Sequence, residues 1–191
     1  CMDIEKIDKW LCVDDNSNED DRKKMQENYP FIEFYFKTFT EKGHPQSMNI
    51  IREKVTTPYI FHMEDDWKFV SRKNYITHCM DVISQSDKIG QCLINKNYSE
   101  TEKDVKIIGG VLNRTNAGTR YFLHQYCATK EEYDLFYKSH GCIGANCAYW
   151  KHFSLRPSLL KKHILTELGP YNEKISHFEA EYSDKYLNAG Y

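Results

Sequence analysis

Two clusters of acidic side chains follow apolar runs in the first half of the chain. Asp14 and Asp15 come directly after residues 7–13, and the three acids at 64–66 come directly after residues 59–63. Ligands of open α/β sheets bind at the carboxyl ends of the strands, and adjacent carboxylates repel one another unless a cation neutralises them. A hard divalent cation, Mg²⁺ or Mn²⁺, shared with a diphosphate would do so through oxygen ligands. For Asp14 alone, capping of the following helix is an equally good interpretation.

The elements that hold these acids alternate between strand and helix. Ser17 is expected to cap the first helix, Pro30 is expected to end it, and apolar residues at a period of 3.6 indicate the later helices. Such alternation is typical of a parallel sheet with crossover helices. We therefore predict strands at residues 7–13, 31–37, 59–63 and 89–94, and helices at 19–28, about 48–55 and 75–83.

The second half of the chain alternates less clearly. Residues 97–118 are polar and contain glycine, which favours loops or short antiparallel strands. Helices are predicted over residues 130–137, 159–168 and 179–188. No repeat, linker or low-complexity tract divides the sequence, so we expect one domain.

Composition excludes several classes of protein. The 26 basic and 28 acidic side chains give a net charge of −2, which argues against a general nucleic-acid-binding protein. No apolar run reaches the roughly 20 residues of a membrane span, and no secretory signal opens the chain. The seven cysteines lack zinc-ligand spacing, so reduced thiols in a cytoplasmic protein are expected. A disulfide between Cys142 and Cys147 is the alternative.

Three segments carry a resemblance to a known family. They are WLCVDDNSNEDD at residues 10–21, EKGHPQSMNIIREKVTTPYIFHMEDDW at 41–67 and LGPYNEKISHFEAEYSDKYLNAGY at 168–191. These segments resemble GT-A glycosyltransferases, closest to the family 2 type, which have a V-D-D-x-S strand end, a D-x-D-type metal motif and a final A-G-Y. The resemblance implies a nucleotide-diphospho-sugar transferase-like α/β fold, in which helices flank a mixed, mainly parallel sheet.

The same resemblance implies how the domain is organised. Residues 1–191 would form a single catalytic domain, with a nucleotide-binding half at about 1–95 and an acceptor half at 96–191. The chain opens in what looks like the end of the first helix of that fold. The first strand is therefore expected to be missing from this sequence, which would expose a sheet edge.

The resemblance also implies roles for the acids at a donor site. Asp15 would accept a hydrogen bond from the uracil ring of a UDP-sugar, and Asp14 would position it. Asp66 would be the principal ligand of Mn²⁺ or Mg²⁺ and Glu64 a less certain one, while Asp65 would contact the ribose, or the metal through water. The metal would bridge both phosphates and stabilise the charge that accumulates on the departing UDP.

Two further residues complete the implied site. Lys42 lies where the family's loop approaches the donor and could touch phosphate or ribose; a solvated lysine in a turn is the alternative. Glu179 would be the base that removes the proton of the attacking hydroxyl, although Phe178 stands where the family has another acid. The alternative for Glu179 is an acid that interacts with a helix macrodipole.

The implied activity is metal-dependent transfer of a sugar from a nucleotide-sugar donor to a hydroxyl group. The enzyme would be of the hexosyltransferase type, with a UDP-sugar as donor, a glycan, protein or lipid as acceptor, and inversion at the sugar. Two other classes stay open. A nucleotidyltransferase also uses strand-end carboxylates and Mg²⁺, and a sugar- or nucleotide-binding module would have the site without catalysis.

Overall fold

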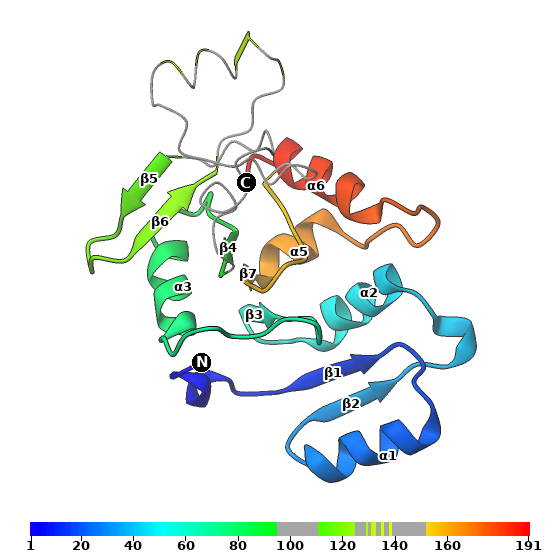
Figure 1. The fold of residues 1–191 in the computed structure, drawn as a ribbon. Coiled ribbons are helices and arrows are strands. Elements are labelled where there is room, and N and C mark those ends of the chain that lie inside the picture. Colours follow the sequence, from blue (N-terminus) through cyan, green and yellow to red (C-terminus); the bar gives the residue numbers. More distant parts are fainter. Residues whose placement is uncertain (95–110, 125–128, 130, 133–134, 136–137, 139–151) are drawn as a thin grey trace.

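The computed structural model describes residues 1–94, 111–124, 129, 131–132, 135, 138 and 152–191, which have a mixed α/β fold (Figure 1). The α/β class expected from the sequence is thus confirmed at this coarse level. In chain order the elements are the 3-10 turn η1 (Ile4–Lys6), β1 (Leu11–Asp14), α1 (Glu19–Asn28), β2 (Glu33–Phe36), the 3-10 turn η2 (Phe39–Glu41), α2 (His44–Lys54), β3 (Tyr59–His62), α3 (Tyr75–Ile83), β4 (Gln91–Leu93), β5 (Val111–Arg114), β6 (Arg120–Leu123), β7 (Ser158–Lys161), α5 (Lys162–Leu168) and α6 (Phe178–Asn188).

Strands β1 and β2 form a parallel pair covered by a helix on each face (Figure 1). On the α1 side, the Arg22 guanidinium lies 5.1 Å from the centroid of the Phe36 ring. On the α2 side, the Lys54 ammonium lies 4.7 Å from the centroid of Tyr35. Consecutive strand residues point to opposite faces, so Tyr35 and Phe36 meet different helices. The predicted β–α–β unit is present.

The cap of α1 differs from the sequence prediction. Asn18, and not Ser17, occupies the N-cap, and its side-chain oxygen accepts a hydrogen bond of 2.9 Å from the Asp21 amide. The Ser17 amide instead donates to Asp14 Oδ2 at 3.0 Å. The helix therefore begins one residue later than a Ser17 cap requires.

The expectation of a mainly parallel sheet is wrong for the described strands. β1–β2 is the only parallel pairing among them, and β7 pairs antiparallel with both β3 and β4, in the order β3-β7-β4. β3 and β4 run in the same direction, but β7 separates them. Residues 159–161 were predicted to be helical but belong to this strand, whereas Lys162–Leu168 is helical as expected.

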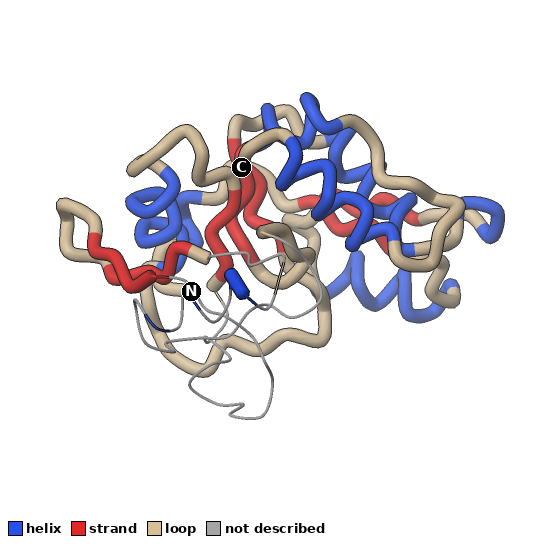
Figure 2. Tube along the Cα trace, turned by 90° about the horizontal axis from the view of Figure 1, so that it is seen from above, coloured by secondary structure: helices blue, strands red, loops and turns tan. Residues whose placement is uncertain are grey.

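The core lies on both faces of β7, whose residues are all buried. Leu160 packs with Ile164 and Tyr182 of the C-terminal helices, and Leu159 packs with Cys79 and Ile83 of α3. The view from above shows α3 on one side of these strands and the C-terminal helices on the other (Figure 2). The alternation of the strand therefore divides the core into two layers.

Several sequence predictions fall outside the described residues. These are the loops at 97–110, most of the helix at 130–137, and the Cys142–Cys147 disulfide. Strands β5 and β6 form an antiparallel hairpin, in line with the antiparallel alternative for residues up to 118. Cys1, Cys12, Cys79 and Cys92 are free thiols, and none of the described helices has the length and apolarity to cross a bilayer.

The N-terminal segment caps α3 from a distance. Asp3 is buried, and its carboxylate accepts hydrogen bonds from the amides of Thr77 at 2.6 Å and Ile76 at 3.4 Å. The N-cap residue itself, Asn74, makes no side-chain cap bond. Burial opposes ionisation of Asp3, but these hydrogen bonds outweigh it and lower its pKa. Asp3 therefore supplies the negative charge and the acceptors that the start of α3 lacks.

We expect Asp3→Ala to lower the free energy of unfolding by about 1–2 kcal/mol at pH 7, as the loss of an N-cap usually does. The pKa of Asp3 is lowered on folding, so its contribution is complete above the unfolded pKa of about 3.9. The contribution disappears as the pH falls through the folded pKa. Urea unfolding at pH 7 and pH 3 should show a smaller difference between the two proteins at pH 3. A difference that stays constant would contradict this role.

Candidate functional site

Asp14 serves the structure of the β1–β2 unit. It is buried at the end of β1, and its Oδ2 accepts hydrogen bonds from Arg22 Nε at 2.9 Å and from the Ser17 amide at 3.0 Å. Arg22 also donates from Nη2 to the Lys37 carbonyl at 2.7 Å. Asp14 thus ties α1 to the ends of both strands, which favours the structural alternative over a contact with a ligand.

Asp15 has one oxygen held by the protein and an exposed side chain. Its Oδ1 accepts hydrogen bonds from Lys37 Nζ at 2.7 Å and from the Gly43 amide at 2.9 Å. Burial opposes ionisation of Asp15, but these bonds and the nearby charge of Lys42 outweigh it, so its pKa lies below the usual value. The side chain is 46% exposed. Asp15 is an ionised acceptor that a ligand in solvent can reach.

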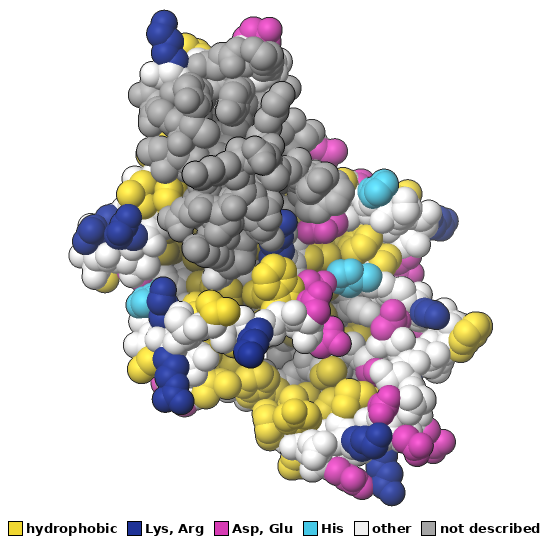
Figure 3. Space-filling view, viewed as in Figure 1, with side chains coloured by type: hydrophobic (Ala, Val, Ile, Leu, Met, Phe, Trp, Pro, Cys, Tyr) yellow, Lys and Arg dark blue, Asp and Glu magenta, His cyan; other side chains and the backbone are white. Residues whose placement is uncertain are grey.

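The turn before α2 joins Asp15 to the second acidic cluster. Gly43 has a φ of +121°, a conformation that favours glycine, and its amide bonds Asp15 while the next residue, His44, faces Glu64. His44 Nε2 lies 3.6 Å from Glu64 Oε1, and the Trp67 indole donates to Glu64 Oε2 at 3.2 Å. A histidine and acidic side chains lie together in the middle of the face in Figure 3. The ends of β1 and β3 therefore meet at this turn.

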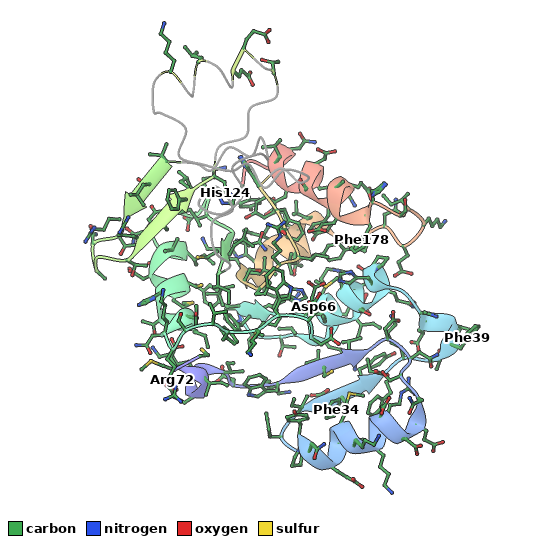
Figure 4. The ribbon with its side chains drawn as sticks, in the orientation of Figure 1. Phe34, Phe39, Asp66, Arg72, His124 and Phe178 are labelled. Atoms are coloured by element: carbon green, nitrogen blue, oxygen red, sulfur yellow. The ribbon has the colours of Figure 1, made fainter. Side chains whose placement is uncertain are left out.

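Asp65 and Asp66 directly follow Glu64 and are exposed. The pKa of the Cys12 thiol is raised by burial and then by the charges of Asp14 and Asp65, which places Asp65 close to β1. Figure 4 shows Asp66 in the middle of the molecule, between β1 and the start of α6. Neither Asp65 nor Asp66 has a hydrogen bond or ion pair with the described parts of the chain, so both carboxylates are available to a ligand.

Glu179 lies in the first turn of α6, which packs against the start of α2. The ring of the preceding residue, Phe178, meets the His44 ring edge-on, with centroids 5.2 Å apart. Glu179 Oε1 accepts a hydrogen bond of 2.7 Å from the Leu155 amide. Glu179 is thus near the turn that gathers the other acids, but one of its oxygens anchors the backbone at residue 155. Its place in the first turn also fits the macrodipole alternative.

His62 is a buried, uncharged side chain close to His44. It is buried in β3, two residues before Glu64, and Nε2 has no hydrogen-bond partner among the described residues. Burial, and then the nearby His44, lower its pKa to about 4. His62 is therefore neutral at neutral pH and adds no positive charge to the cluster of acids.

Two members of the cluster were not identified from the sequence. Lys37 was assigned only to a strand, yet it is fully buried and bonded to Asp15. The resemblance places His44, like Lys42, in the loop that approaches the donor, but it assigns His44 no role of its own. The sequence signal for Lys37 is its position at the end of an aromatic strand. A lysine buried there needs hydrogen-bonding partners, because a buried charge is costly unless it is paired. The signal for His44 is its place directly after Gly43 at the start of a helix.

The acids after β3 are better suited to a metal that is shared with a substrate's phosphates than to a metal held by protein side chains alone. In the described part of the chain, no three His, Cys, Asp or Glu side chains come together as a set that could hold a metal. Mg²⁺ is often held by one or two carboxylates together with the phosphates of the substrate. Asp65 and Asp66 suit that mode because they are exposed and have no internal partner. Glu64 suits it less well because His44 and Trp67 already contact it.

A separate groove on the surface is lined by none of the acids of the candidate site. It lies between α1 and β2, has a volume of about 520 Å³, and is lined by Glu19, Arg22, Lys23, Gln26 and Phe36. Arg22 in that groove is committed to Asp14. The candidate site is therefore defined by the side chains that converge on the turn at Gly43 and His44.

No protein-family model matches the chain, and no curated protein matches it.

Proposed function

We propose that this protein is a metal-dependent glycosyltransferase of the GT-A type, with a nucleotide-sugar as donor and a UDP-sugar as the first choice. The observation that carries the proposal is the meeting of three segments at one turn. Asp15 after β1 bonds the Gly43 amide, Glu64 after β3 faces His44, and Glu179 directly follows Phe178, whose ring meets the His44 ring. These segments are the ones whose motifs resemble that family.

The residues around the turn suit the parts of such a donor. Asp15 presents an exposed, ionised carboxylate, which accepts hydrogen bonds and cannot donate them, as recognition of an N–H on a base requires. Lys42, exposed beside it, offers positive charge to phosphate or ribose. Asp66 and Asp65 would hold Mn²⁺ or Mg²⁺ together with the diphosphate. Such a metal stabilises the negative charge on the leaving group.

Glu179 remains the proposed base for the acceptor hydroxyl. Its hydrogen bond to the Leu155 amide fixes the direction of the carboxylate, and general-base catalysis depends on such positioning. Attack from the side of the sugar opposite to the diphosphate would invert the anomeric centre. The acceptor would be the hydroxyl of a glycan, protein or lipid that reaches Glu179.

The experiment that tests the proposal is a calorimetric titration with UDP, GDP, CMP and dTDP, each with and without Mn²⁺. We expect UDP to bind with the highest affinity and its binding to require Mn²⁺. Binding of none of these nucleotides would overturn the assignment of the donor. Tight binding of a nucleoside triphosphate in place of UDP would instead favour a nucleotidyltransferase.

Glu179→Gln separates catalysis from binding. The amide keeps an oxygen for the Leu155 amide but cannot take a proton, so we expect the rate of UDP release from a UDP-sugar to fall by about 10²–10⁴-fold. The affinity for UDP should change by less than about 2-fold. Unchanged release would show that Glu179 has only a structural role and would favour a binding module.

A further inference from the structure

Lys37 is a fully buried lysine at the hub of the candidate site. It directly follows β2, and its ammonium donates three hydrogen bonds, to Asp15 Oδ1 at 2.7 Å, the Gly43 carbonyl at 2.8 Å and Ser47 Oγ at 2.8 Å. A lysine ammonium has three donors, so all of them are used. The Lys37 ammonium therefore links the end of β1, the turn at Gly43 and the first part of α2 through hydrogen bonds.

These bonds leave Asp15 with one fixed and one open oxygen. Oδ1 receives both Lys37 and the Gly43 amide. Within the described parts of the chain no hydrogen bond reaches Oδ2, and the side chain is 46% exposed. A buried charge is costly unless it is paired, so Lys37 strongly disfavours any rotation of Asp15 that would break the pair. The network thus directs Oδ2 toward solvent.

We propose that Lys37 is a positioning residue that determines which base the site accepts, and that it acts through Asp15. This inference rests on the proposed function. An ionised carboxylate accepts hydrogen bonds only, so it favours uracil, which has an N–H at ring position 3, over cytosine, which has an acceptor there. The preference requires Asp15 to stay charged and aimed, and Lys37 supplies both conditions. Lys37 itself does not contact the ligand because it is fully buried.

Lys37→Met tests the inference through the ratio of the affinities for UDP and CDP, measured by calorimetry with Mn²⁺. Wild type should prefer UDP. In the variant the UDP affinity should fall about 10-fold, as expected for the loss of one well-oriented hydrogen bond to a charged group, while the CDP affinity changes little. An equal fall for both nucleotides, or an unchanged ratio, would overturn the inference.

Matched variants separate positioning from a general effect on folding. Ser47→Ala removes one bond from Lys37 but leaves the Lys37–Asp15 pair, so its UDP-to-CDP ratio should equal that of wild type. In an Asp15→Asn background, Lys37→Met should no longer alter the ratio. If Lys37→Met does not fold, Lys37→Gln carries the same expectation, because glutamine keeps a polar group at this buried position.

The outcomes distinguish this inference from the proposed function. Absence of UDP binding by wild type would overturn both. Equal binding of UDP and CDP by wild type would overturn the role of Lys37 and leave a nucleotide-sugar donor standing. Preference for UDP in wild type together with an unchanged preference in the Lys37 variants would overturn only the role of Lys37.

Discussion

Asp66→Asn is expected to reduce UDP release from a UDP-sugar by about 10²-fold or more, with the Mn²⁺ dependence of UDP binding lost. A factor of 100 corresponds to about 2.7 kcal/mol of transition-state stabilisation, within the several kcal/mol that a Lewis-acid metal supplies. Asp66 is exposed, so asparagine should alter the free energy of unfolding by no more than about 0.5 kcal/mol. The measurements are UDP release and calorimetric titration at several Mn²⁺ concentrations.

Asp8→Asn is the matched control for Asp66→Asn. Asp8 is also an exposed aspartate in a loop, and it lies before β1 instead of after β3. Its replacement changes the net charge by the same amount, so it should leave both UDP release and Mn²⁺ dependence as in wild type. Asp65→Asn should give an intermediate loss if Asp65 contacts the ribose, or the metal through water. Normal release by Asp66→Asn would remove Asp66 from the metal site.

Local patterns in the sequence predicted those elements that are defined by interactions between residues close together in the sequence. The residues of α1 and α3 match the predicted ranges, and α6 begins one residue before its predicted start. Strand β7 could not be predicted in this way. Its four residues run directly into α5 with no glycine or proline to mark a boundary, and its partners β3 and β4 are remote in sequence. A short buried strand and a helical segment cannot be distinguished by periodicity alone.

The candidate site was predictable to the extent that consecutive acids after an apolar run are visible in a sequence. The contacts around Gly43 and His44 were not, because they depend on a turn that brings residues 15, 37, 43 and 64 together. Lys37 also shows why exposure cannot be read from residue type. A lysine is usually solvated, and only the three acceptors from separate segments allow this one to be buried.

Arg22→Met is expected to lower the free energy of unfolding by about 3 kcal/mol, because it leaves the Asp14 carboxylate buried without its cation. Loss of one partner of a buried pair usually costs about 3–5 kcal/mol. The lower end applies because the Arg22 side chain is 23% exposed, so water can partly replace it. The variant also loses the bond from Arg22 to the Lys37 carbonyl. Urea unfolding at pH 7 measures the effect.

The double variant Arg22→Met, Asp14→Asn decides whether Asp14 has a structural role. If the destabilisation comes from an unpaired buried charge, neutralising Asp14 should restore a large part of the lost stability. The double variant should also keep most of the affinity for UDP, since Asp15, and not Asp14, presents an open oxygen to solvent. If Asp14→Asn alone abolished UDP binding while stability was retained, Asp14 would belong to the donor site, and the Arg22 pair would serve to orient it there.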